Sequence, residues 1–136
     1  MKNISTKNKN FKEKFTSEMS KEIDLENCYY NYYEDSQINY KRYSYLRFFK
    51  NGQYAYFTNS ENNIDTNKLE KASHVGYYIV ENDILKLETP TGNFNTKSYK
   101  VIWEFYIQKN ILKQKKTKAE FEIKKITGLI TVVPNW

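Results

Sequence analysis

Apolar and polar residues alternate along most of the chain after residue 28, which is typical of β-strands with one buried face. Three pairs of such segments flank short polar turns, at Asn51-Gly52, Asn82-Asp83 and Lys109-Asn110. Each pair predicts a β-hairpin. The predicted strands comprise residues 28–33, 43–50, 53–59, 75–81, 84–89 and 100–108, the return strand after Lys109-Asn110, and residues 119–124.

The first hairpin contains Arg47 among aromatic neighbours. A two-residue turn at Asn51-Gly52 pairs Arg47 with Tyr56. In this register, Arg47 shares a face with Tyr45, Phe49, Tyr54 and Tyr56, and the other face carries Leu46, Phe48, Ala55 and Phe57. If the apolar face is the core, Arg47 lies on an exposed tyrosine-rich surface. If the tyrosine face lines the interior, Arg47 is a buried cation that needs a carboxylate or an anionic ligand.

In the other two hairpins, the sequence indicates more clearly which residues pair across the strands. Pairing across Lys109-Asn110 sets Phe105 against Gln114 and Glu104 against Lys115. Because an opposite-charge pair marks the solvent side, Phe105 and its alternating neighbour Trp103 are predicted to face the interior. Pairing across Asn82-Asp83 collects one face made of Gly76, Tyr78, Val80, Leu85 and Leu87.

The N-terminal region has a different period. We predict that residues 1–10, which are basic and rich in asparagine, are disordered. Apolar residues then recur every fourth position, which predicts an amphipathic helix over 11–23. Those residues are Phe11, Phe15, Met19 and Ile23. We interpret the helix as a plug covering one end of the domain. A surface helix for a membrane or a protein partner is the alternative.

Serial hairpins without intervening helices favour an antiparallel sheet over a parallel one. We therefore predict a mainly β fold, an antiparallel up-and-down barrel of about eight strands, with residues 11–136 forming one domain. The chain start lacks the apolar run of a secretion signal, and no segment has the length of a membrane span. We accordingly expect a cytoplasmic protein.

Catalytic and metal-binding patterns are scarce. Cys28 is the single cysteine and His74 the single histidine, so the chain allows no internal disulfide and no cysteine cluster for a metal. The four glycines do not form a phosphate-binding loop. Paired carboxylates fall on outward faces or at turns, where no burial raises their pKa. We expect no enzymatic activity, no cofactor and no bound metal.

Charge adds a preference for anions. The net charge is +6, which can favour polyanions. Only two of the 22 basic residues are arginines, Arg42 and Arg47, and arginine is the better residue for bidentate phosphate and base contacts. Binding of single-stranded nucleic acid is therefore a secondary alternative, based on the interleaved aromatic and basic residues of 41–50.

Two hairpins resemble those of a known barrel family. Residues 45–54 contain Leu-Arg-Phe-Phe-Lys-Asn-Gly, and residues 76–87 combine a glycine, an aromatic residue, a tight polar turn and alternating Ile and Leu. These stretches are similar to the lipocalin-like (calycin-type) β-barrel domain of small uncharacterised bacterial proteins and, more distantly, to the carboxy-terminal domain of some F-box adaptor proteins. The resemblance covers roughly residues 28–125. It implies a barrel with room for a binding cavity and no enzymatic activity.

The predicted function is non-catalytic binding of a small hydrophobic or amphipathic ligand in a barrel cavity. The candidate ligand-binding residues are Tyr45, Arg47, Tyr54, Tyr56, Tyr78, Trp103, Phe105 and Gln114. The alternatives are a protein–protein interaction module, which uses an aromatic surface and the N-terminal helix, and single-stranded nucleic-acid binding.

Overall fold

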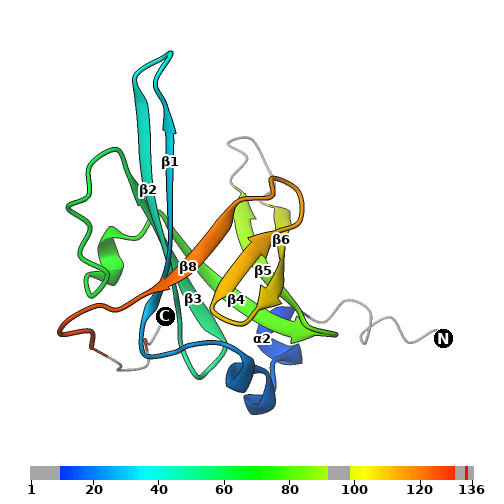
Figure 1. The fold of residues 1–136 in the computed structure, drawn as a ribbon. Coiled ribbons are helices and arrows are strands. Elements are labelled where there is room, and N and C mark those ends of the chain that lie inside the picture. The colour runs from blue at the N-terminus through cyan, green and yellow to red at the C-terminus, as the bar shows by residue number, and fades with distance from the viewer. Residues whose placement is uncertain (1–9, 92–98, 131–133, 135–136) are drawn as a thin grey trace.

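The computed structural model describes residues 10–91, 99–130 and 134. Within these residues, the strands pair antiparallel in chain order and β8 closes on β1. The fold is a closed up-and-down barrel of eight strands, which confirms the predicted fold class (Figure 1). The strands are β1 (Cys28–Asp35), β2 (Tyr40–Phe48), β3 (Gln53–Asn59), β4 (His74–Glu81), β5 (Ile84–Thr91), β6 (Tyr99–Gln108), β7 (Ile111–Gln114) and β8 (Glu120–Lys124).

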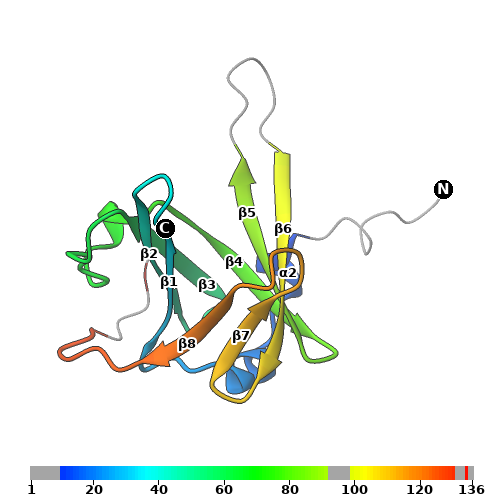
Figure 2. The same cartoon turned by 45° about the horizontal axis from the view of Figure 1, so that its top comes forward.

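The β1–β2 hairpin is longer than the wall on either side of it. β8 pairs with β1 only up to Tyr30, and β3 pairs with β2 only back to Tyr43. Residues 31–35 and 40–42 therefore extend beyond the barrel as a two-stranded arm (Figure 1). Figure 2 brings this end of the barrel forward and shows β5 and β6 on the other side of the barrel from the arm.

The second and third hairpins have the predicted registers. Glu81 pairs with Ile84 across a two-residue turn, in which Asn82 and Asp83 both have positive φ, as a type I′ turn requires. Phe105 pairs with Gln114, as predicted for the turn at 109–110. The charged pair is also present, with 3.1 Å between Lys115 Nζ and Glu104 Oε1.

The first hairpin differs from the prediction by one residue. Its loop has three residues, 50–52, because Gly52 takes the left-handed conformation (φ 94°) and the Phe49 N–H donates to the Gln53 carbonyl at 2.9 Å. Arg47 therefore pairs with Ala55 instead of Tyr56. Since neighbouring strand residues point to opposite faces, this shift moves every β3 side chain to the other face.

The shift sorts the aromatic residues into two clusters. Tyr54 and Tyr56 join the barrel interior, whereas Ala55 and Phe57 lie on the outer face. That outer face is covered by a polar segment that we call the strap, residues 60–73, and by residues 126–130. The strap includes a short 3-10 helix, η2 (Leu69–Lys71). The outer cluster comprises Cys28, Tyr45, Phe49, Ala55 and Phe57, with Tyr30, Ile64, Leu69, Ala72, Val75, Ile126 and Leu129 packed against it.

The single helix predicted over 11–23 is wrong. The segment forms α2 (Phe11–Lys14) and a 3-10 helix, η1 (Ser17–Glu22), separated by extended backbone at Phe15 and Thr16. Asn10 caps α2 through a capping box with Glu13. Phe15 therefore lies between the two helices in extended backbone, and its ring packs against Tyr78 of the barrel.

The predicted plug is nevertheless present. The Phe15 ring contacts Tyr78 edge-on at 5.3 Å, and Ile23 belongs to the interior cluster. Both helices lie at the end of the barrel opposite the tip of the arm (Figure 1). The predicted disorder concerns residues 1–9, which lie outside the described residues, together with Asn10, whose side chain caps α2. In the described part of the chain, no helix combines the length and the apolarity that crossing a membrane requires.

Candidate ligand-binding site

The barrel interior has two halves, and the half next to the plug is filled. We call it the closed half. Tyr78 contacts the rings of Phe48 and Phe15, and its hydroxyl donates to the Phe49 carbonyl at 2.8 Å. The Tyr54 hydroxyl donates to the Glu88 carbonyl at 3.1 Å, and burial raises the pKa of both tyrosines. The closed half comprises Tyr29, Leu46, Phe48, Tyr54, Tyr78, Val80, Leu85, Leu87, Phe105 and Leu112.

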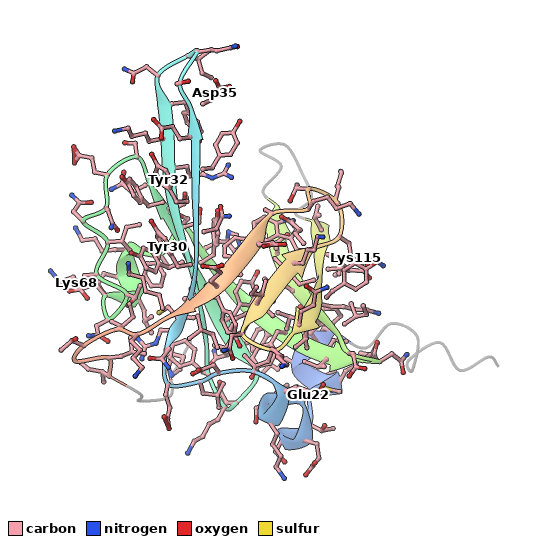
Figure 3. All side chains as sticks on the ribbon, in the orientation of Figure 1. Glu22, Tyr30, Tyr32, Asp35, Lys68 and Lys115 are labelled. Carbon is pink, nitrogen blue, oxygen red and sulfur yellow. The ribbon has the colours of Figure 1, made fainter. Side chains whose placement is uncertain are left out.

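The opposite half opens to solvent through a cavity of about 960 Å³. We call this cavity the mouth. It is formed where the arm, the beginning of β6 and the turn between β7 and β8 come together. In Figure 3, Lys115 lies across from the arm, on which Tyr32 and Asp35 follow Tyr30 of the barrel wall towards the tip. The mouth is lined by Asn31, Tyr33, Arg42, Tyr56, Val101, Ile102, Trp103, Glu104, Gln114, Lys115, Lys116, Thr117, Lys118, Ala119 and Phe121.

The floor of the mouth is aromatic. The rings of Tyr56 and Trp103 meet edge-on at 5.3 Å, and His74 packs against both, at 5.1 and 5.3 Å. The Tyr56 hydroxyl lies 3.2 Å from Ser44 Oγ. Burial lowers the pKa of His74, so its imidazole is neutral at pH 7. Its Nε2 atom is buried and has no hydrogen-bond partner among the described residues.

The rim of the mouth is cationic. Arg42, Lys115, Lys116 and Lys118 line it together with one carboxylate, Glu104. Glu104 forms its ion pair with Lys115. Arg42 stacks on Tyr33, with 5.2 Å between the guanidinium carbon and the ring centroid. Low-dielectric walls around clustered charges of one sign focus the electric field on the cavity.

The structure separates the eight predicted site residues into three groups. Tyr56, Trp103 and Gln114 line the mouth. Tyr54, Tyr78 and Phe105 also face the interior, but they belong to the closed half and are fully buried. Tyr45 and Arg47 lie outside the barrel wall, beneath the strap.

Arg47 is a buried cation, as the second interpretation predicts, but its side chain lies outside the barrel wall and not in the interior, so neither predicted location is correct. It is 2% exposed, and Nη1 donates to the Thr66 carbonyl at 2.8 Å and to Asn67 Oδ1 at 3.3 Å. The guanidinium also lies 4.8 Å from the Phe49 ring centroid. Burial lowers the pKa of Arg47. The strap thus supplies the partners that the sequence alone did not reveal.

Arg42 was missed because the strand predicted over 43–50 begins one residue after it. Period-two alternation from Leu46 back through Ser44 places Arg42 on the interior face, and Tyr33 pairs with it across the arm. The sequence contained this signal. However, the strand was predicted to begin at residue 43, so the alternation was not continued to Arg42.

The two residues most capable of nucleophilic chemistry are not neighbours. Cys28 belongs to the outer cluster, whereas His74 packs against the aromatic floor inside the barrel. Burial raises the pKa of the Cys28 thiol to about 11, so it is protonated at neutral pH. Among the described residues, no group of three or more His, Cys, Asp or Glu side chains is placed to hold a metal ion.

Comparisons of this chain with the models of known protein families, with curated proteins and with solved structures return no significant match. The candidate ligand-binding site is the mouth, an open aromatic cavity with a cationic rim at one end of an otherwise filled barrel.

Proposed function

We propose that the protein binds a small, largely apolar or amphipathic ligand in the mouth and does not transform it chemically. The observation that carries this proposal is the half-filled interior. A barrel of eight strands has just enough room for side chains or for one small ligand, and here one end is packed while the other stays open. The cavity volume falls within the range of small-molecule sites, which are mostly apolar with a few polar groups.

The residues of the mouth fit such a ligand. Tyr56, Trp103 and Phe121 offer aromatic surface, and Gln114 and Arg42 offer hydrogen-bond donors. The lipocalin-like hairpins of the sequence support the same role, since barrels of that kind hold ligands at their open end. We also propose that the protein is cytoplasmic and that it binds its ligand without a cofactor.

Binding of a neutral fluorescent probe, N-phenylnaphthylamine, tests the proposal. We expect the probe to bind, to increase in fluorescence and to raise the melting temperature. Ala119→Trp fills the mouth and is expected to abolish binding. Glu120→Trp is the matched control, because residue 120 is the next residue along the chain, is exposed and does not line the mouth. Failure of the wild-type protein to bind, or equal binding by the two variants, would contradict the proposal.

A protein interaction module is the second candidate, and the arm favours it. Tyr33 is 45% exposed and Ile38, at the tip, is 69% exposed. Exposed aromatic residues of this kind are enriched at protein interfaces. The N-terminal segment is less suited to this role than predicted, because Phe11 and Ile23 are buried against the barrel. Loss of partner capture after Ile38→Ser and Tyr40→Ser, two exposed arm residues that do not line the mouth, with probe binding intact, would support this second role.

Single-stranded nucleic acid is the third candidate, through the lysines of the rim. Retention of a labelled oligonucleotide in low salt and its steep loss as the salt concentration rises would support it. The pairing of Lys115 with Glu104 weakens this reading, since it neutralises one of the rim cations.

A further inference from the structure

We infer that the ligand of the mouth is an amphipathic anion, whose acid group binds at Arg42 and whose apolar body lies on Tyr56 and Trp103. This inference rests on the proposed function and specifies the chemical class of its ligand.

Positive charge is concentrated in the mouth. Four basic side chains and one carboxylate line the mouth, so this one cavity carries half of the net charge of +6. Lys115 and Glu104 neutralise each other at 3.1 Å. The surplus therefore comes from Arg42, Lys116 and Lys118, none of which forms an ion pair with another described residue. A neutral ligand leaves this surplus uncompensated, whereas an anion is attracted by it.

The Nε atom of Arg42 is buried and has no hydrogen-bond partner in the part of the chain that the structure describes. A buried donor without a partner is costly, and a bound oxygen acceptor removes that cost. Stacking on Tyr33 holds the planar guanidinium in place, so its fork of donors is preorganised for an acid group.

Both arginines of the chain have a buried Nε without a hydrogen-bond partner among the described residues, and they differ in their terminal nitrogens. Arg47 is buried outside the barrel, where Nη1 donates to the Thr66 carbonyl and to Asn67 Oδ1. Through these hydrogen bonds, Arg47 holds the strap against the barrel wall. Arg42 makes no such bond to a described residue, and it lines a cavity of about 960 Å³. Arg42 is therefore the arginine that is available to a ligand.

This cation lies close to apolar surface. Arg42 shares the mouth with Tyr56, Trp103 and Phe121, and the Tyr56 and Trp103 rings meet at 5.3 Å. An inorganic anion would leave this aromatic surface bare, and a neutral hydrocarbon would leave the cations bare. A molecule with one acid group on an apolar body contacts both.

Two fluorescent probes with the same aromatic skeleton test the inference. Anilinonaphthalene sulfonate carries an acid group, and N-phenylnaphthylamine lacks it. We expect the wild-type protein to bind the sulfonate more tightly. Arg42→Gln should weaken sulfonate binding by about tenfold or more, the effect of losing one charge-assisted hydrogen bond, and should weaken binding of the neutral probe much less. Arg42→Lys keeps the charge without the fork and should fall between the two.

Lys124→Gln is the matched control, because it also removes one positive charge but lies on the outer face, over the Tyr30 ring. It should not change the affinity for either probe. Displacement of the sulfonate by decanoate and by decyl phosphate, but not by decanol, would show that the site accepts an acid group on an alkyl chain. A difference between the first two would identify the preferred acid.

The outcomes separate the inference from the proposal beneath it. If both probes bind with equal affinity and Arg42→Gln changes neither, the anion inference is overturned while the ligand-binding function stands. If Lys124→Gln weakens the sulfonate as much as Arg42→Gln does, the attraction comes from net charge and the Arg42 site is overturned. If neither probe binds, the proposed function itself fails.

Discussion

The two halves of the barrel interior are built from the same alternating strands, yet they differ in whether their buried polar groups have hydrogen-bond partners. In the closed half, the Tyr54 and Tyr78 hydroxyls donate to backbone carbonyls and every ring is enclosed. In the mouth, Arg42 Nε lacks a hydrogen-bond partner among the described residues, as does Nε2 of His74, which packs against Tyr56 and Trp103. Satisfied groups and dense packing stabilise a fold, whereas unsatisfied groups next to a cavity mark a place for a ligand.

The largest expected effect comes from the closed half. Phe105 is fully buried and its ring contacts Phe121 at 5.8 Å. We expect Phe105→Ala to lower the free energy of unfolding by about 3–5 kcal/mol, measured by urea denaturation. Trp103→Ala, two residues away in the mouth, should cost clearly less because that ring is only partly buried. Equal losses for the two variants would mean that the mouth is packed as tightly as the closed half.

The next prediction sharpens the difference between the two arginines. Arg47→Gln removes the donors to the strap from a buried position and should cost about 2–3 kcal/mol of stability. Arg42→Gln should change stability by less than about 0.5 kcal/mol, because Arg42 makes no hydrogen bond or ion pair with the described residues and its contact with Tyr33 lies on the exposed arm. Thermal or chemical denaturation measures both. The comparison breaks down if Arg42→Gln is the more destabilising change.

The contact between the plug and the barrel carries a smaller effect. Gly52 has a φ of 94°, and a Cβ atom there would lie 2.7 Å from Cγ of Phe15. Gly52→Ala is expected to cost about 1–2 kcal/mol. The cost should shrink in a Phe15→Ala background, where only the backbone strain remains. Probe binding in the mouth should stay unchanged in both backgrounds, and a parallel loss of binding would show that the two halves are coupled.

The smallest effect is a pH dependence on the outer side of the wall. Burial raises the pKa of Cys28 from 9.0 to about 11, so the folded state keeps a proton that the unfolded state loses. This contribution to stability is complete below pH 9 and is lost as the pH rises from about 9 to 11. The loss of unfolding free energy is about 1.4 kcal/mol at about pH 10. Cys28→Ala should remove that part of the alkaline destabilisation. If the unfolding free energy of the variant falls with pH as steeply as that of the wild-type protein, the pKa of Cys28 is not raised.

The barrel itself could be predicted because local signals agreed with the fold. The third hairpin has alternating residues, a two-residue turn and the Glu104–Lys115 pair, and all three indicate one register. The first hairpin has the Asn51-Gly52 sequence, which suits a two-residue loop but also a three-residue loop with glycine in the left-handed position. Tertiary packing selects the second, since it places Tyr54 and Tyr56 inside the barrel.

The surroundings of Arg47 could not be predicted, because they come from the strap. That segment is polar, and its few apolar residues, such as Ile64 and Leu69, show no period that indicates which surface they cover. The nearer of the two acceptors of Arg47 is the backbone carbonyl of Thr66, which any residue at that position supplies, and the other is Oδ1 of Asn67. The mouth was found only in part, since three of its residues were predicted and Arg42 was not.

Mapping of the ligand contacts by amide and indole chemical shifts tests the central claim most directly. In a titration of the labelled protein with anilinonaphthalene sulfonate, the largest shifts are predicted at Arg42, Tyr56 and Gln114 and at the indole N–H of Trp103, assigned with Trp103→Phe. Tyr78 in the closed half should shift little. Shifts concentrated at Tyr78, or along the outer face at Tyr45, would contradict a ligand site in the mouth.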